Sequence, residues 1–158
     1  MSIASDAIDS LNELGFALNN KPTFDIPQLP MDITELDDGG LMELFVQLTM
    51  WSDYVAGAFA IAAINEKEAE TAVKQYEASG MLANWTGAKA DRLAIAKATI
   101  TASERMQELT RNYDTAYAFR KLLETKTNNI DRDTQLVSRE LTRRTADNSG
   151  FRSRQRRI

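Results

Sequence analysis

Apolar residues recur at alternating steps of three and four over most of this chain, which predicts long amphipathic helices. The clearest pattern begins near Leu41, directly after the helix-breaking sequence Asp38-Gly39-Gly40. We expect this helix to end by Gly80, because a glycine readily takes the left-handed conformation that closes a helix. Its apolar side continues for more than four heptads and is strongly polar only at Asn65, which is typical of a coiled-coil seam. The positions on that side are Leu41, Leu44, Leu48, Trp51, Val55, Ala58, Ala62, Asn65, Ala69, Ala72 and Tyr76.

A second long helix is expected from about Ala88 to about Thr145, since neither Gly nor Pro interrupts that stretch. Its apolar stripe meets the polar Ser103, continues with a register shift, and alternates polar with apolar residues from Arg120 onward. Such a thin stripe gives a helix little stability of its own, so we expect the distal half to bind a neighbouring subunit or nucleic acid, or to stay partly mobile. The stripe consists of Leu93, Ala96, Ile100, Met106, Leu109, Tyr113, Ala116, Arg120, Leu123, Thr127, Ile130, Thr134, Val137 and Leu141.

The first forty residues follow different patterns. Apolar residues at helical spacing predict a short amphipathic helix from Ile3 to about Ala17. Residues 21–30 contain all three prolines of the chain and should form an extended connector, because proline removes a backbone donor and clashes with the preceding helical turn.

These elements together predict an all-α fold. We expect a long antiparallel helical hairpin with coiled-coil-like seams, a short N-terminal helix and a basic C-terminal tail. The predicted divisions are an acidic helix and Pro-containing connector over residues 1–40, the hairpin over residues 41–145, and a basic tail over residues 146–158 that is disordered when unbound.

The seams permit two interpretations. They form the core of an intramolecular hairpin, or they also provide the interface of a homo-oligomer, in which Asn65 would help to set the helical register. The residues predicted for such an interface are Leu44, Leu48, Trp51, Val55, Asn65, Ile130, Val137 and Leu141.

Composition argues against catalysis. The 158 residues include no His and no Cys, which excludes serine–histidine and cysteine–histidine catalysis, disulfides and zinc–thiolate sites. Asp37, Asp38 and Glu43 could coordinate Mg²⁺, but acidic residues are also favoured at a helix N-terminus by the helix dipole. We therefore predict no enzymatic activity, no cofactor and no metal.

Charge is distributed unevenly along the chain. Residues 1–60 carry ten acidic residues and one basic residue, residues 61–138 carry eleven of each, and residues 139–158 carry seven Arg and two acidic residues. Arg suits phosphate because its guanidinium donates in a fixed fork and stays charged, and Phe151 could stack on an exposed base. The alternative is a solubilising tail, or a tail that docks on the acidic head, residues 1–60, of another subunit. The candidate nucleic-acid-binding residues at this end are Arg139, Arg143, Arg144, Phe151, Arg152, Arg154, Arg156 and Arg157.

No membrane segment is expected. The N-terminus is acidic and lacks the basic and apolar regions of a signal peptide. The most apolar stretch, residues 55–64, is shorter than the roughly 20 residues that a membrane-spanning helix needs. These features predict an intracellular, cytoplasmic protein.

The layout resembles the UvsY-type family of phage recombination mediators over about residues 41–144. The likeness is carried by Leu48-Thr49-Met50-Trp51, the helix to Lys74, the Ser79-Gly80 loop, and the block from Lys97 that closes with Ser138-Arg139-Glu140-Leu141-Thr142-Arg143-Arg144; within that block Ala102, Tyr113, Tyr117, Leu122 and Leu123 contribute.

The resemblance implies a ring-forming helical protein of the bacterial host cytoplasm that binds single-stranded DNA. Its further partners would be a RecA-type recombinase and single-strand-binding protein. Lys74 matches the first residue of a basic pair in the family, but the second falls near the uncharged Tyr76, and this chain is more acidic at its N-terminus. Both departures shift the expected DNA contacts toward residues 139–157.

Two other functions remain open from the sequence. One is a structural or assembly protein of a phage particle, or a helical scaffold, whose basic tail docks on another protein. The other is a small inhibitor that mimics DNA with its acidic head, although those acidic residues are scattered along an extended connector.

Overall fold

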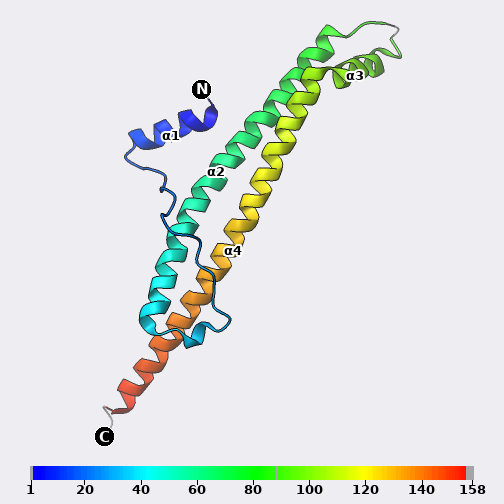
Figure 1. The fold of residues 1–158 in the computed structure, drawn as a ribbon. Helices are drawn as coiled ribbons and strands as arrows, with labels where there is room; N and C mark the ends of the chain where they lie inside the picture. Colours follow the sequence, from blue (N-terminus) through cyan, green and yellow to red (C-terminus); the bar gives the residue numbers. More distant parts are fainter. Residues whose placement is uncertain (1, 88, 156–158) are drawn as a thin grey trace. The chain divides into compact units, whose positions relative to one another are not determined.

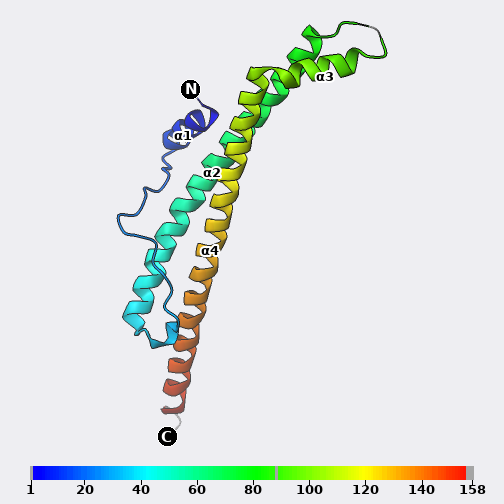
Figure 2. The same ribbon diagram turned by 45° about the vertical axis from the view of Figure 1, so that its right-hand side comes forward.

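A computed structural model describes residues 2–87 and 89–155 of the chain. It confirms the all-α prediction, and the described residues contain no strand. Helices α2 and α4 run side by side in both views (Figures 1 and 2). The elements are α1 (Ile3–Glu13), the 3-10 turn η1 (Ile33–Glu35), α2 (Asp38–Ala83), α3 (Arg92–Ala102) and α4 (Glu104–Gln155).

The chain divides into two compact units. The first unit combines residues 2–17 with Ala58–Leu123, and the second combines Leu18–Gly57 with residues 124–155. Helices α2 and α4 therefore each contribute to both units. Within the first unit Arg120 pairs with Glu66, and within the second Ser52 Oγ donates to Asp131 Oδ1 over 2.7 Å. The residue number of the α4 partner thus increases as that of the α2 partner decreases, which confirms that the two helices are antiparallel.

The predicted seams form the core of each unit. In the second unit the fully buried Leu41 and Leu48 of α2 pack in the same core as Val137 of α4, and in the first Ala62 and Leu109 are buried. The interleaved residues of the α4 stripe are half-buried at the expected spacing. Two expected positions differ, because Leu93 and Asn65 are exposed.

The residues predicted for an oligomer interface are mostly accounted for by this core. Leu141 is half-buried and Asn65 is exposed, but the other six are buried within the single chain. Their burial therefore requires no second subunit, and the homo-oligomer stays a prediction. These six are Leu44, Leu48, Trp51, Val55, Ile130 and Val137.

The second long helix is divided in two, contrary to the prediction of one continuous helix from about Ala88. Ser103 adopts an extended backbone conformation between α3 and α4. Its Oγ donates to Ile100 O over 2.8 Å and accepts from Met106 N over 3.2 Å, and Tyr76 Oη donates to it over 3.1 Å. A serine hydroxyl that satisfies free backbone groups is a strong helix cap, which explains why the helix breaks here.

Gly80 does not cap α2 as predicted. The helix continues through it to Ala83, and a Cβ atom at Gly80 would lie only 2.8 Å from Ile100 Cγ1. The glycine is therefore needed for the close approach of α3, and not for a left-handed turn.

Both long helices extend beyond their predicted ends. Asp37 precedes α2 and accepts a hydrogen bond from Gly40 N over 2.7 Å, so Gly39 and Gly40 lie inside the first turn. Helix α4 continues through Gly150 to Gln155, so the expected disordered tail is helical as far as that residue. Residues 156–158 lie outside the described part of the chain.

The N-terminal segment packs on α2. Helix α1 ends earlier than expected, where Gly15 has φ +84° and Phe16 N donates to Leu11 O over 3.1 Å, a Schellman closure. In the first unit Ala4 is buried and Ile3 N donates to Glu68. Residues 21–30 contain no helix, as their three prolines predict.

Helix α2 is long and apolar enough to cross a membrane by length and composition alone, which is weak evidence for a span, so the absence of a membrane segment stays a prediction. About a fifth of the most apolar 18-residue window is buried inside the protein. A helix whose seam packs against α4 needs the same apolar residues, because they supply its core contacts.

Candidate nucleic-acid interface

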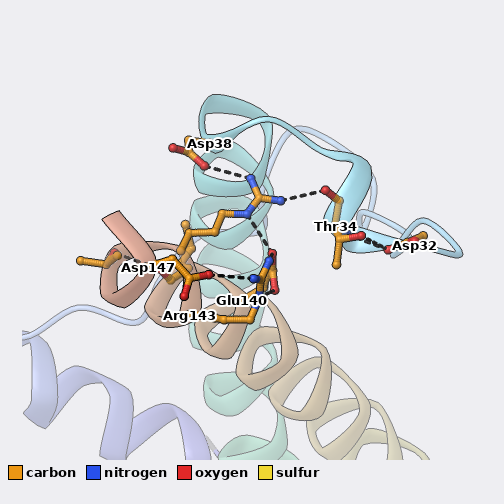
Figure 3. A network of polar contacts seen from close by, with 9 residues as sticks. Asp32, Thr34, Asp38, Glu140, Arg143 and Asp147 are labelled. Atoms are coloured by element: carbon orange, nitrogen blue, oxygen red, sulfur yellow. Dashed lines mark hydrogen bonds and ion pairs between the residues drawn. The ribbon is translucent and has the colours of Figure 1, made fainter. Parts of the chain in front are cut away.

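The described part of the predicted basic end is organised around a buried carboxylate. Glu140 is 7% exposed and faces the C-terminal turns of α4 in the second unit (Figure 3). It accepts hydrogen bonds from Arg143 Nε (2.8 Å) and Nη2 (2.7 Å), and from Arg144 Nε (2.8 Å). These bonds, with Arg143 first, lower the pKa of Glu140 to about 2. Glu140 therefore stays ionised and holds both arginines.

Arg144, one of the predicted nucleic-acid-binding residues, makes structural contacts within the chain. Its side chain is 17% exposed, and its Nη1 donates to Asp38 Oδ1 over 2.9 Å. Its Nη2 donates to Thr34 O over 3.0 Å, while Thr34 is itself held by Asp32 Oδ1, which accepts from its backbone N and hydroxyl. Bonds from Thr34 lower the pKa of Asp32. Arg144 thus ties α4 to η1 and the first turn of α2.

Arg143 is divided between protein and solvent. Besides Glu140 it contacts Asp147 Oδ2 over 3.0 Å, and its side chain remains 56% exposed (Figure 3). Because exposed ion pairs are weak, a phosphate could replace Asp147 at little cost.

Arg139 is the most available of the predicted cations whose side chains the structure describes. It is exposed and has no hydrogen-bond or ion-pair partner among the described residues. Arg132, which the sequence reasoning did not select, is similar. It is 68% exposed, and its Nε lies 3.5 Å from Asp133 Oδ1, a long contact. Both guanidinium groups can therefore meet an anion from solvent.

Lys74 belongs to the first unit. On α2 it forms an ion pair with Glu70, which also accepts from Lys67 Nζ over 2.7 Å. Bonds from Lys67 and then Lys74 lower the pKa of Glu70 to about 2. Lys74 is still 64% exposed, so this i,i+4 pair leaves it accessible but partly neutralised.

The remaining predicted residues lie at the end of the chain. Phe151, Arg152 and Arg154 occupy the last turns of α4, where the structure describes the backbone. Arg156 and Arg157 lie outside the described residues.

Metal binding has no support among the described residues. The described residues contain no group of three or more carboxylates that could hold a metal. Asp37 caps α2 and Asp38 pairs with Arg144, so two of the three acids considered for Mg²⁺ have structural partners. A hollow between α2 and α4 in the first unit has no titratable side chain in its lining, which consists of Ala62, Asn65, Asn112, Thr115, Ala116 and Phe119.

No protein-family model, curated protein or solved structure matches this chain.

Two parts of the site escaped the sequence reasoning. Glu140 was counted only as a charge within the basic end, although its position three and four residues before Arg143 and Arg144 is the spacing of helical ion pairs. Arg132 lies seven residues before Arg139, two turns along the same face of α4, which a helical projection would have shown.

Proposed function

We propose that this protein is a non-enzymatic, homo-oligomeric protein that binds single-stranded DNA through Arg residues toward the end of α4. The observation that carries the proposal is the excess of seven Arg over two acidic residues in residues 139–158, with Arg139 open to solvent. Glu140 and Asp147, the two acidic residues, are both paired with arginines of the same helix. An incoming phosphate backbone therefore meets little uncompensated negative charge at this end.

The biological role we propose is recombination mediation in the cytoplasm of a bacterial host. The resemblance to UvsY-type phage proteins supports this role, and the helical hairpin is consistent with it. Such a protein helps a RecA-type recombinase to load on DNA that is covered by single-strand-binding protein.

Oligomerisation would supply the affinity. A single basic end makes few phosphate contacts, and each is weak at physiological salt. Several such ends on one particle would make the later contacts intramolecular, which raises the overall affinity without any new kind of contact.

Salt-dependent binding tests the proposal. Fluorescence anisotropy of a labelled oligothymidylate should show binding at low salt and a linear fall of log K with log salt concentration. Absence of binding at low salt, or binding that does not depend on salt, would overturn it. The mass of the particle, from light scattering after gel filtration, tests the oligomer separately.

A truncation after Asp147 isolates the terminal residues. It removes Phe151, Arg152, Arg154, Arg156 and Arg157 but keeps Glu140, Arg143 and Arg144 in place. Binding should weaken and its salt dependence should decrease. Equal binding by the truncated protein would remove the terminal residues from the interface.

A second candidate function is a structural or assembly protein of a phage particle. Two observations favour it: Arg144 is used within the chain, and Met42, Val46 and Met50 form an exposed apolar row along α2. Here the basic end would dock on protein. Recovery of the chain from purified virions, or in a stoichiometric protein complex without affinity for DNA, would support this function over the first.

A further inference from the structure

One exposed face of α4 carries no acidic side chain over about four helical turns. It consists of Asn128, Arg132, Gln135, Arg139 and Thr142, spaced by four, three, four and three residues, and we call it the polar face. All five residues are exposed and belong to the second unit. At this spacing they project on the side of α4 opposite the buried Ile130 and Val137.

The acidic residues of the same stretch are held elsewhere. Asp131 accepts a hydrogen bond from Ser52, and Glu140 is buried beneath Arg143 and Arg144. Asp133 is the acid in contact with the face, with its Oδ1 3.5 Å from Arg132 Nε. Such a long, exposed contact contributes little, so it does not hold Arg132 against a phosphate.

The two arginines lie two helical turns apart on the polar face. Seven helical residues correspond to about 10 Å along the axis. Gln135 lies between the two arginines and Asn128 lies one turn before Arg132. Neither amide has a hydrogen-bond partner among the described residues, so both can donate to phosphate or sugar oxygens.

The face lacks what a protein partner would need. Stable protein interfaces centre on buried aromatic or aliphatic side chains, and none of these five residues is apolar. Alternating guanidinium and amide groups are instead what a nucleic-acid backbone contacts.

We propose that the polar face of α4 is the track along which the phosphate backbone of single-stranded nucleic acid lies, with Arg132 and Arg139 each contacting a phosphate. The inference rests on the proposed function and refines it, because it extends the contacts from the end of the chain back along α4 to Arg132 within the second unit. Arg143 flanks the track and adds to it when a phosphate displaces Asp147.

A matched pair of variants of the full chain tests the track. Arg132→Gln with Arg139→Gln removes two charges from the polar face. Arg105→Gln with Arg111→Gln removes two charges from the same helix in the first unit. Binding of a fluorescein-labelled oligothymidylate is measured by anisotropy over a range of salt concentrations, and circular dichroism with thermal melting confirms that each variant is folded.

The polar-face variant should bind more weakly. Its plot of log K against log salt should be less steep, with a slope smaller in magnitude by about 1.4, the value for two phosphates on a single strand. The control variant should keep the affinity and slope of the wild type. A gain-of-function variant, Gln135→Lys, should bind more tightly, and the magnitude of its slope should increase by about 0.7.

The outcomes separate the inference from the function. If the wild type binds and the two double variants bind equally well, the polar face is not the track, while DNA binding by the protein stands. Failure of Gln135→Lys to tighten binding also overturns the track. If the wild type does not bind at low salt, the proposed function falls and the track falls with it.

Discussion

Arg144 near the end of α4 donates to the carboxylate of Asp38 in the first turn of α2, over 2.9 Å and across 106 residues of sequence. The same guanidinium also bonds Thr34 and Glu140. A residue that composition marks as a phosphate ligand is therefore the point at which α4, α2 and η1 are joined.

Replacing Arg144 should loosen the start of α2. Arg144→Gln loses the charge that holds Asp38 and Glu140, so hydrogen exchange at residues 33–40 should become severalfold faster and the melting temperature should fall. Arg139→Gln is the control, because Arg139 has no polar partner among the described residues. Exchange rates in Arg144→Gln equal to those of the control would contradict the joining role.

Acid should destabilise the protein partly through Glu140. The pKa of this residue is about 2 when folded, below its ordinary value of 4.5, so its stabilisation is complete above pH 4.5 and is lost as the pH falls toward 2. Glu70 behaves in the same way. Urea denaturation from pH 7 to pH 2 should show a shallower loss of stability for Glu140→Gln, and a still shallower one when Glu70→Gln is added. A wild-type slope in both variants would refute this assignment.

Gly80 should not tolerate a side chain. In Gly80→Ala the new Cβ meets Ile100 Cγ1, and overpacking of this kind costs about 1–3 kcal/mol. Gly39→Ala is the matched control, since its Cβ has only ordinary contacts at 3.8 Å and a helical alanine is favoured over glycine by roughly 0.5–1 kcal/mol. Chemical denaturation measures both.

A double variant checks the cause. Combining Gly80→Ala with Ile100→Ala removes the clashing group, so the pair should be less destabilised than the sum of the two single changes. Simple additivity would show that the contact with Ile100 is not responsible.

Breaking the ion pair between Glu66 and Arg120 should destabilise the protein, whereas replacing both residues with apolar ones should have a smaller effect. Both side chains are largely covered, with 16% and 20% exposure, and Arg120 lies 5.6 Å from the centre of the Tyr117 ring. Glu66→Leu removes one carboxylate partner from this partly buried guanidinium, which should cost about 1–3 kcal/mol. Adding Arg120→Leu should recover most of that loss, because apolar residues often substitute for buried ion pairs. Denaturation curves that give additive losses would argue against this account.

The fold was largely predictable because the spacing of apolar residues along the sequence marks the buried seams of both long helices. Leu41, Leu48 and Val137 are buried where the three-and-four pattern places them. The errors lie where a side chain has a specific partner. Ser103 was noticed as a polar interruption, but the hydrogen bond that its hydroxyl accepts from Tyr76 of another helix is not visible in the local sequence. Gly80 resembled a helix cap until the position of Ile100 was known.

The basic end was less predictable for the same reason. Charge density identifies Arg139, Arg143 and Arg144 alike, but it does not contain the antiparallel register that brings residue 144 to residue 38. Only that register separates an arginine used for structure from one left open to solvent. Helical spacing alone would have revealed the pairing of Glu140 and the position of Arg132.

The antiparallel pairing also implies an order of assembly. Tyr76–Ser103, Glu66–Arg120, Ser52–Asp131 and Asp38–Arg144 join residues that are 27, 54, 79 and 106 positions apart. Closing the shortest loop first costs the least chain entropy, and each contact then shortens the loop that the next must close. The two helices should therefore zip from their connecting loop toward the termini. The contact between Arg144 and Asp38 would form last, and it would be the first to open when the protein begins to unfold.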